Sequence, residues 1–240
     1  MSELIWQPVT LIWKSYSAPM EGYIRHMYLD VKGLVTTGVG NLLRTRLDAL
    51  QLPWQRADGL HASTAEIVAE WERMKAATHL AAAGHIAARK VATLFLTDEA
   101  IDALVASRLR SNSAHLTNQF PEFPAWPADA QLGTLSMAWA AGSSLTTTFP
   151  KWSEAARSMD WITCAYECRL REQGNPGVAP RNKAQRLCFE NAYAVGVNKT
   201  DPAVLHWPAR YAPWTQRPDV SADAVATAQL PMERDIDAEI

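Results

Sequence analysis

The sequence predicts an α+β fold that is predominantly helical, with a small β-hairpin lobe and a larger helical lobe. Its 240 residues, 48% of them hydrophobic, can bury a substantial core and are most simply one domain with extensions. Residues 34–39 are β-branched and alternating, and they follow a turn signal at residues 30–33, which predicts a hairpin. From residue 42 onward, the pattern becomes mostly helical.

The N-terminal part is expected to lead into the hairpin. Residues 1–17 alternate poorly between polar and apolar types and contain Pro8, so we expect a short extension that packs on the body. Pro19 to Gly22 is expected to end a short helix that presents Glu21, because Gly22 favours a break there. The first strand of the hairpin would then cover residues 23–29.

Two amphipathic helices are indicated in the middle of the chain. Residues 64–77 begin with a Ser-Thr cap, and their apolar residues recur at helical spacing. Residues 96–104 repeat the pattern, with a Thr cap followed by an acidic first turn. Residues 112–129 are expected to be a loop, because they contain three prolines and few charges.

A helix over residues 130–141 is expected next, and Trp139 within this Ala-rich segment is most simply a core residue. Beyond residue 198, five prolines and the absence of periodicity predict an extended tail that contains Trp207 and Trp214. The expected organisation is therefore an N-terminal extension over 1–17, a main domain over 18–198 and a Pro-rich extension over 199–240, packed on the domain or trailing from it.

Charge and hydropathy exclude several classes. The chain has 23 Lys and Arg against 25 Asp and Glu, a formal net charge of -2, so it lacks the basic footprint of a nucleic-acid binder. The richest apolar stretch, residues 76–96, is interrupted by basic residues, and no run reaches the roughly 18–20 residues of a membrane helix. The N-terminus has no secretory signal pattern, which predicts synthesis in the cytoplasm.

The three cysteines, Cys164, Cys168 and Cys188, cannot all be paired within one chain. We therefore expect reduced thiols that serve helix packing. A zinc site at Cys164 and Cys168 would lack the second ligand pair, so no metal is predicted.

The chemistry-bearing motif of the chain consists of Glu21, Asp30 and Thr36, in the order E-x8-D-x5-T. Two carboxylates close in sequence are what glycosidic bond cleavage needs, and a neighbouring hydroxyl can hold water. Thr36 opens a Thr-Thr-Gly-Val-Gly run, whose Gly38 and Gly40 we interpret as strand glycines that allow close packing or a bulge. Phosphate binding is disfavoured because no P-loop lysine follows.

The segment 21–43 resembles the catalytic stretch of the phage-type lysozymes, which are muramidases. Their Glu, Asp and Thr fall here on Glu21, Asp30 and Thr36 without a gap. The resemblance covers roughly residues 18–195, strongly at its two ends. Asn41 stands where many relatives carry a His that pairs with an acid, which puts that structural ion pair in doubt.

The resemblance also implies that an Arg returns from the C-terminal part to the catalytic Glu. The tract that contains it aligns with the family only after a one-residue gap, so Arg181 is the first candidate and Arg186 the second.

The function implied by the resemblance is hydrolysis of the β-1,4 bond between N-acetylmuramic acid and N-acetylglucosamine in peptidoglycan. Glu21 would protonate the glycosidic oxygen, Asp30 would stabilise charge and help to activate water, and Thr36 would position that water. No organic cofactor is implied. The enzyme would act in the periplasm or cell wall after release or delivery, and a phage endolysin, a tail-borne lysozyme and a bacterial effector all remain open.

The alternative is a non-catalytic binding or structural module of a phage particle or secretion system that keeps the lysozyme fold. Residues 1–15 and 199–240 would then be docking arms. The intact Glu21, Asp30 and Thr36 favour the enzyme, because a scaffold has no need of all three. In either case the termini leave a carrier or an immunity protein open as a partner.

Overall fold

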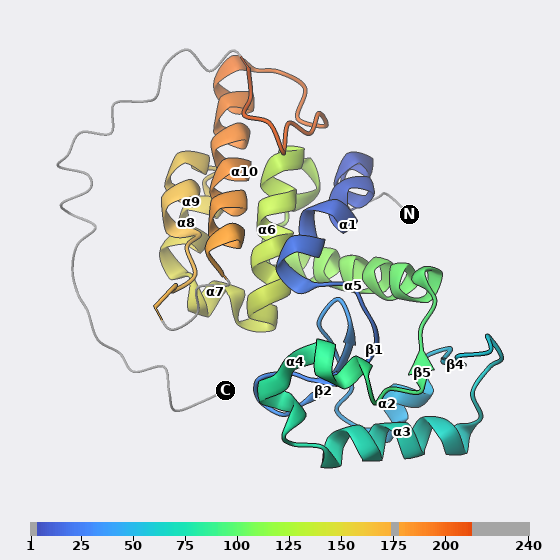
Figure 1. The fold of residues 1–240 in the computed structure, drawn as a ribbon. Helices are drawn as coiled ribbons and strands as arrows, with labels where there is room; N and C mark the ends of the chain where they lie inside the picture. Colours follow the sequence, from blue (N-terminus) through green and yellow to red (C-terminus); the bar gives the residue numbers. More distant parts are fainter. Residues whose placement is uncertain (1–3, 174–177, 213–240) are drawn as a thin grey trace.

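The computed structural model describes residues 4–173 and 178–212. The chain is predominantly helical with a small antiparallel sheet, as the sequence predicts. Figure 1 shows two lobes, a smaller one that contains the strands and a larger one made of helices, with the long helix α5 (Asp98–Gln119) crossing between them.

The smaller lobe is built on the expected hairpin, which β3 extends to a three-stranded antiparallel sheet in the order β1-β2-β3. A second pair, β4 and β5, is also antiparallel. The elements of this lobe are β1 (Ile24–Leu29), β2 (Val35–Gly38), β3 (Asn41–Leu42), α2 (Arg46–Leu50), β4 (Gln55–Arg56), α3 (Thr64–Ala76), α4 (Leu80–Arg89) and β5 (Leu94–Phe95). The lobe is therefore larger than a hairpin, because α3 and α4 cover β1 and bury Met27 and Leu29.

The helix starts expected from capping residues are confirmed. Ser63 precedes α3, and its side chain and that of Glu66 each accept from the other residue's backbone N–H, at 3.3 and 2.7 Å. Thr97 precedes α5 and accepts from the Ala100 N–H at 3.1 Å. The prediction of a loop over residues 112–129 is wrong at its start, because α5 continues to Gln119. Pro121 restricts only the residue before it, so it permits a helix that ends two residues earlier.

The larger lobe surrounds α6, whose residues 128–139 are all buried, Trp139 included. The elements of this lobe, besides α5, are α1 (Gln7–Glu21), a 3-10 turn (Phe123–Ala125), α6 (Ala128–Ala141), a second 3-10 turn (Gly142–Ser144), α7 (Leu145–Thr148), α8 (Pro150–Arg157), α9 (Trp161–Glu167) and α10 (Ala179–Asn198). Because α1, α5 and α10 all pack on α6, this helix fixes the relative positions of the segments that carry the candidate site.

The N-terminal boundary expected at residue 17 falls inside α1, which is one helix from Gln7 to Glu21. Pro8 lies in its first turn, where a missing N–H is tolerated. Trp13 and Tyr16 are each 1% exposed and belong to the core. Residues 7–17 are therefore part of the main body and not an appendage.

Residues 199–212 also pack on the body. The buried carboxylate of Asp129 accepts from the N–H groups of His206 at 2.8 Å and Trp207 at 2.9 Å. The indole of Trp207 lies edge-on against Tyr16, with 4.9 Å between ring centroids. Trp214 and the rest of the expected tail lie outside the described residues.

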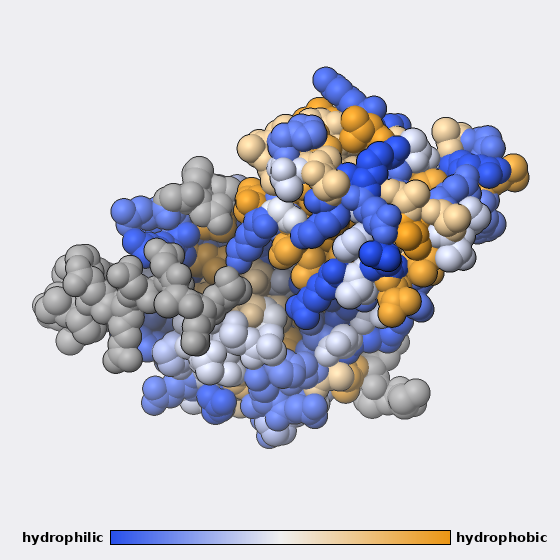
Figure 2. Space-filling model, turned by 90° about the horizontal axis from the view of Figure 1, so that it is seen from below, coloured by the Kyte–Doolittle hydropathy of each residue, from blue (hydrophilic) through white to orange (hydrophobic). Residues whose placement is uncertain are grey.

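The three cysteines are free and buried, in agreement with their expected packing role. Among residues 4–173 and 178–212, no helix is long and apolar enough to cross a membrane. Figure 2 looks onto the smaller lobe, where orange hydrophobic residues lie among blue charged ones. Its exposed large hydrophobic residues are Val31, Leu47, Leu60, Ile86 and Val91. Such dispersed apolar side chains are normal at a protein surface.

Candidate active site

Glu21 is the last residue of α1, directly before the chain enters the smaller lobe. Gly22 ends the helix with φ 71°, a left-handed value that favours glycine, and its N–H donates to the Ala18 carbonyl at 3.1 Å. The turn is tight, since a β-carbon on Gly22 would lie 3.3 Å from Cδ1 of Ile24. The Glu21 side chain is 18% exposed, so the carboxylate is accessible but largely enclosed.

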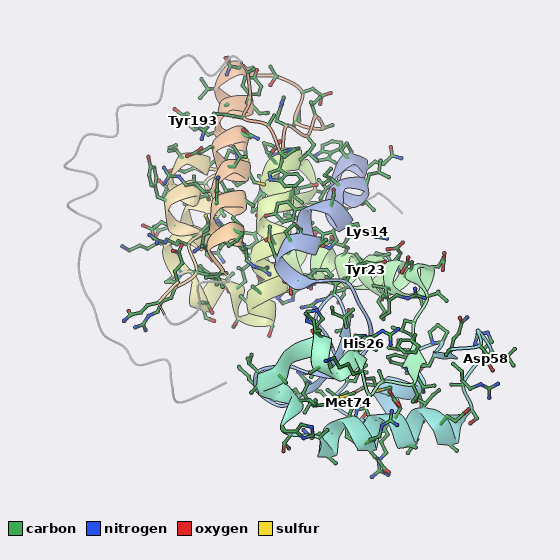
Figure 3. The ribbon with its side chains drawn as sticks, viewed as in Figure 1. Lys14, Tyr23, His26, Asp58, Met74 and Tyr193 are labelled. Atoms are coloured by element: carbon green, nitrogen blue, oxygen red, sulfur yellow. The ribbon has the colours of Figure 1, made fainter. Side chains whose placement is uncertain are left out.

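A polar contact links α1, the entry to β1 and α5. Nζ of Lys14 donates to Asp102 at 3.3 Å and lies 4.4 Å from the centre of the Tyr23 ring. The Tyr23 hydroxyl donates to Asp102 and to the Asp98 carbonyl. Figure 3 shows Lys14 and Tyr23 where α1 meets α5. Lys14 and Asp102 are each 53% exposed, so the contact orients the segments on either side of Glu21 more than it stabilises the fold.

Arg181 forms an ion pair with Glu21. It lies in the first turn of α10, and its Nη2 donates to Oε1 of Glu21 while its Nη1 donates to the Ser136 carbonyl of α6 at 3.1 Å. The Arg181 side chain is 9% exposed. The contact that the resemblance implied for Arg181 is therefore present in the structure.

Arg186 does not reach Glu21. Its Nε donates to Glu190 at 2.9 Å, and its guanidinium lies 5.1 Å from the centre of the Tyr166 ring. Arg186 is more than one turn further along α10 than Arg181, so it points to a different side of the helix. It belongs to the packing of α10 on α9.

Asp30 lies at the turn of the hairpin. Its Oδ1 accepts from the N–H groups of Lys32 and Leu34, both at 2.9 Å, and Gly33 closes the turn with φ 71°. Within the described part of the chain, Oδ2 of Asp30 accepts no hydrogen bond. One carboxylate oxygen thus fixes the turn, and the other is free to meet water or substrate.

Thr36 lies opposite Tyr28 in the antiparallel pairing of β1 with β2. Directly paired residues point to the same face of a sheet, so these two side chains are neighbours. Thr36 is 5% exposed, and its hydroxyl donates to the Leu34 carbonyl at 3.1 Å. The oxygen lone pairs of this hydroxyl remain free to accept from a water molecule.

Tyr28 is a site residue that the sequence analysis missed. Burial first, and then the negative charges of Glu21 and Asp30, together raise the pKa of the Tyr28 phenol to about 12. This phenol therefore lies within electrostatic reach of both carboxylates. The sequence did contain one signal for Tyr28. It stands two residues before Asp30, and alternate residues of a strand point to the same face of the sheet.

Gly38 and Gly40 both have left-handed φ values, 61° and 69°. A β-carbon on Gly38 would lie 3.0 Å from Oδ1 of Asn41, which accepts from the Val39 N–H at 3.2 Å. A β-carbon on Gly40 would lie 3.2 Å from Oε2 of Glu21. The glycines thus allow the backbone turn to approach the carboxylate closely, which a larger residue would prevent.

Arg108 of α5 is the second site residue that the sequence analysis missed. It donates to the Gly40 carbonyl at 3.1 Å and to the Trp139 carbonyl at 2.9 Å. Burial lowers the pKa of Arg108, whereas the charge of Glu21 raises it and that of Arg181 lowers it again. The sequence did contain one signal for Arg108. This charged residue stands between Val105 and Leu109, two buried positions of the same helix, and an unpaired charge is rare in such a place.

The chain matches no protein-family model and no curated protein in sequence. The function is therefore inferred from the chemistry of the site.

Among residues 4–173 and 178–212, no group of three or more His, Cys, Asp or Glu side chains is placed to hold a metal ion. One surface pocket outside the Glu21 region lies in the smaller lobe, lined by Arg56, Glu66, Ala69, Glu70, Arg73, Thr93 and Leu94. Its buried Glu70 is already bonded to Thr93 and Arg73, so this polar cluster is explained as structural support.

Proposed function

We propose that this protein is a lysozyme-type glycoside hydrolase of the lysozyme-like fold, which cleaves the β-1,4 bond between N-acetylmuramic acid and N-acetylglucosamine in peptidoglycan. The observation that carries the proposal is the pairing of Glu21 with Arg181 at the junction of the lobes, with the phenol of Tyr28 in reach of both Glu21 and Asp30. Glycosidic bond cleavage uses two carboxyl groups, one as the acid and the other as the base that stabilises charge. Two carboxylates held apart on two lobes suit these two roles.

Glu21 acts as the general acid. Its Oε1 is held by Arg181, while its Oε2 lies on the side of the Gly40 backbone. In the acid form of Glu21 the proton is therefore carried by Oε2, and it passes from there to the leaving glycosidic oxygen as the bond to the sugar carbon breaks.

Asp30 and Thr36 act on the other reactant, which is water. The free Oδ2 of Asp30 stabilises the positive charge that develops on the sugar ring and accepts the proton of the attacking water. The Thr36 hydroxyl donates to the Leu34 carbonyl, so it accepts a hydrogen bond from the water and turns the water oxygen toward the sugar carbon. No cofactor enters this scheme. The enzyme acts on the cell wall or in the periplasm after release or delivery.

Purified peptidoglycan sacculi provide the test. The wild-type protein is expected to clear a suspension of sacculi and to release new reducing ends. Glu21→Gln keeps the shape of the side chain but removes the proton, so the rate should fall by at least ~10²-fold. Glu154→Gln, an exposed change on α8, is the matched control and should clear at the wild-type rate.

Two outcomes would count against the hydrolase. One is a Glu21→Gln variant that clears within about tenfold of wild type with an unchanged circular dichroism spectrum. The other is a wild-type protein that sediments with sacculi but releases no reducing ends, which would favour the non-catalytic binding module.

A further inference from the structure

Two side chains of the larger lobe hold two successive backbone carbonyls of the smaller lobe. The indole N–H of Trp139 donates to the Val39 carbonyl at 3.2 Å. The guanidinium of Arg108 donates to the next carbonyl, that of Gly40, at 3.1 Å. The turn after β2 is thus attached to α5 and α6 at two adjacent points, next to Glu21.

The geometry requires an arginine. The Arg108 guanidinium stacks on the Trp139 ring, with 4.1 Å to the ring centre. It also donates to two backbone carbonyls, that of Gly40 in the turn and that of Trp139 in α6. One of these, the Trp139 carbonyl, lies in the last turn of α6, where it has no partner within the helix. A planar fork of donors satisfies both carbonyls and stacks at the same time, whereas a lysine ammonium cannot.

The charge of Arg108 has an electrostatic cost that a purely structural contact would avoid. Arg181 already neutralises Glu21, and Arg108 is repelled by Arg181 as well as attracted by Glu21. A second guanidinium beside one carboxylate leaves a net positive charge in a half-buried place. This arrangement holds the carboxylate in a fixed position between the two guanidinium groups.

We infer that Arg108 is a positioning residue for the proposed hydrolysis: it holds the Val39–Gly40 turn against Oε2 of Glu21 and keeps that oxygen directed at the glycosidic bond. The inference rests on the proposed function of Glu21. Arg108 transfers no proton and touches no reacting atom. It acts through the Gly40 backbone and through its charge, and it makes Oε2, and not the Arg181-bound Oε1, the proton-donating oxygen.

Arg108→Met and Arg108→Lys separate the two contributions, with Arg110→Met as the matched control. Arg110 lies on the same helix and is exposed. The measurements are the release of reducing ends from sacculi over a range of pH, the thermal midpoint, and the NMR titration of the Glu21 carboxyl carbon, assigned with Glu21→Gln. The charged and titratable groups that face Glu21 are Arg181, Arg108 and Tyr28, and each variant changes only one of them.

The expected result for Arg108→Met is a rate lowered by about 10- to 100-fold, the effect of a small displacement of a catalytic group. The alkaline limb of its pH profile and the NMR titration should both move to higher pH, because a nearby positive charge has been removed. Arg108→Lys should lose rate as well but keep the wild-type pH limb. Arg110→Met should match wild type in every measurement.

The inference is overturned if Arg108→Met, folded as judged by its thermal transition, hydrolyses like Arg110→Met. It is also overturned if both Arg108 variants lose rate only in proportion to their folded fraction, with the titration of Glu21 unmoved. A wild-type protein that releases no reducing ends would refute the proposed function. In that case the NMR titration still decides whether Arg108 acts on Glu21.

Discussion

The Glu21 carboxylate and the Arg181 guanidinium form an ion pair although 160 residues separate them in the sequence. The pair joins the end of α1 to the start of α10, and both helices pack on α6. Its two side chains are 18% and 9% exposed, so water screens the pair only in part. An ion pair in such a place affects both the position of the carboxylate and the stability of the fold.

Replacing Arg181 is therefore expected to affect activity and stability together. Arg181→Met leaves the Glu21 carboxylate half-buried without its partner and removes a donor to the Ser136 carbonyl. The free energy of unfolding should fall by roughly 1–3 kcal/mol, less than for a fully buried pair because of the remaining exposure. Urea unfolding measures this loss, and clearing of sacculi should fall at least about tenfold.

Arg186→Met is the matched control, because Arg186 lies on the same helix and its pair with Glu190 leaves its side chain 50% exposed. We expect a stability change below about 1 kcal/mol and unchanged clearing. Equal stability and equal clearing in the two variants would show that the Glu21–Arg181 pair has no role of its own.

A methyl group at Gly40 should block the site. In Gly40→Ala the new β-carbon would lie 3.2 Å from Oε2 of Glu21, in a backbone conformation with φ 69°. Gly59 provides a control for the backbone alone, because its φ is 82° and a β-carbon there would meet no heavy atom within 4 Å. Both alanine variants should lose roughly 1 kcal/mol of stability from the left-handed conformation.

Only Gly40→Ala should also lose hydrolysis of peptidoglycan, since only its methyl group meets the proposed acid. The two variants would be compared by thermal denaturation and by the release of reducing ends. If Gly40→Ala and Gly59→Ala hydrolyse at the same rate, the approach of Gly40 to Glu21 does not matter for the chemistry.

His26 of β1 predicts an acid-dependent loss of stability. It is 5% exposed, and its Nε2 lies 2.9 Å from the His85 carbonyl of α4, to which it donates. Figure 3 labels His26 in the smaller lobe. Burial lowers the pKa of His26 from its ordinary value of 6.5. Since protonation is then easier in the unfolded chain, the contribution is present above the unfolded pKa and is lost as the pH falls through the folded pKa.

The free energy of unfolding should therefore fall more steeply from about pH 7 to about pH 5 in the wild type than in His26→Gln, which keeps a donor but does not titrate. Urea unfolding at several pH values gives the two slopes. His61→Gln, at an exposed position, should leave the wild-type slope unchanged. Parallel slopes for wild type and His26→Gln would mean that other groups cause the acid sensitivity.

The parts of the site that the sequence could predict are local. Glu21, Asp30 and Thr36 lie within 16 residues, and the glycine and turn residues between them fix a hairpin whose register follows from neighbouring positions. Helix starts at Ser63 and Thr97 are predictable for the same reason, because a cap acts on the next three residues.

The parts that the sequence could not predict depend on distant contacts. Arg108 reaches a carbonyl 68 residues away, and only the packing of α5 against α6 shows that its cation is enclosed. Val9, Trp13 and Tyr16 of α1 recur at helical spacing, but the rings that Trp13 and Tyr16 pack against, Trp139 and Trp207, are distant in the sequence.

The last prediction is stereochemical: hydrolysis should invert the anomeric carbon. If water attacks the sugar, the two carboxylates must stand roughly 6.5–9.5 Å apart, compared with about 5–5.5 Å when the second carboxylate is the nucleophile. Two features favour the wider site. Oδ1 of Asp30 is held by two backbone N–H groups of its own turn, which restrains its movement toward the sugar. The phenol of Tyr28 lies within electrostatic reach of both carboxylates, and Tyr28 shares a face of the sheet with Thr36.

Proton NMR in the first minutes of hydrolysis of a peptidoglycan oligosaccharide identifies the anomer formed before mutarotation. Water attack on the β-linked chain should give the α anomer, and Thr36→Val should slow its formation while leaving its configuration unchanged, because the hydroxyl only orients the water. Thr147→Val, at an exposed position of α7 where the hydroxyl also donates to a backbone carbonyl, controls for the loss of a hydroxyl. Initial release of the β anomer, or a glycosyl adduct trapped on Asp30, would instead make Asp30 the nucleophile and reduce Thr36 to a structural residue of the sheet.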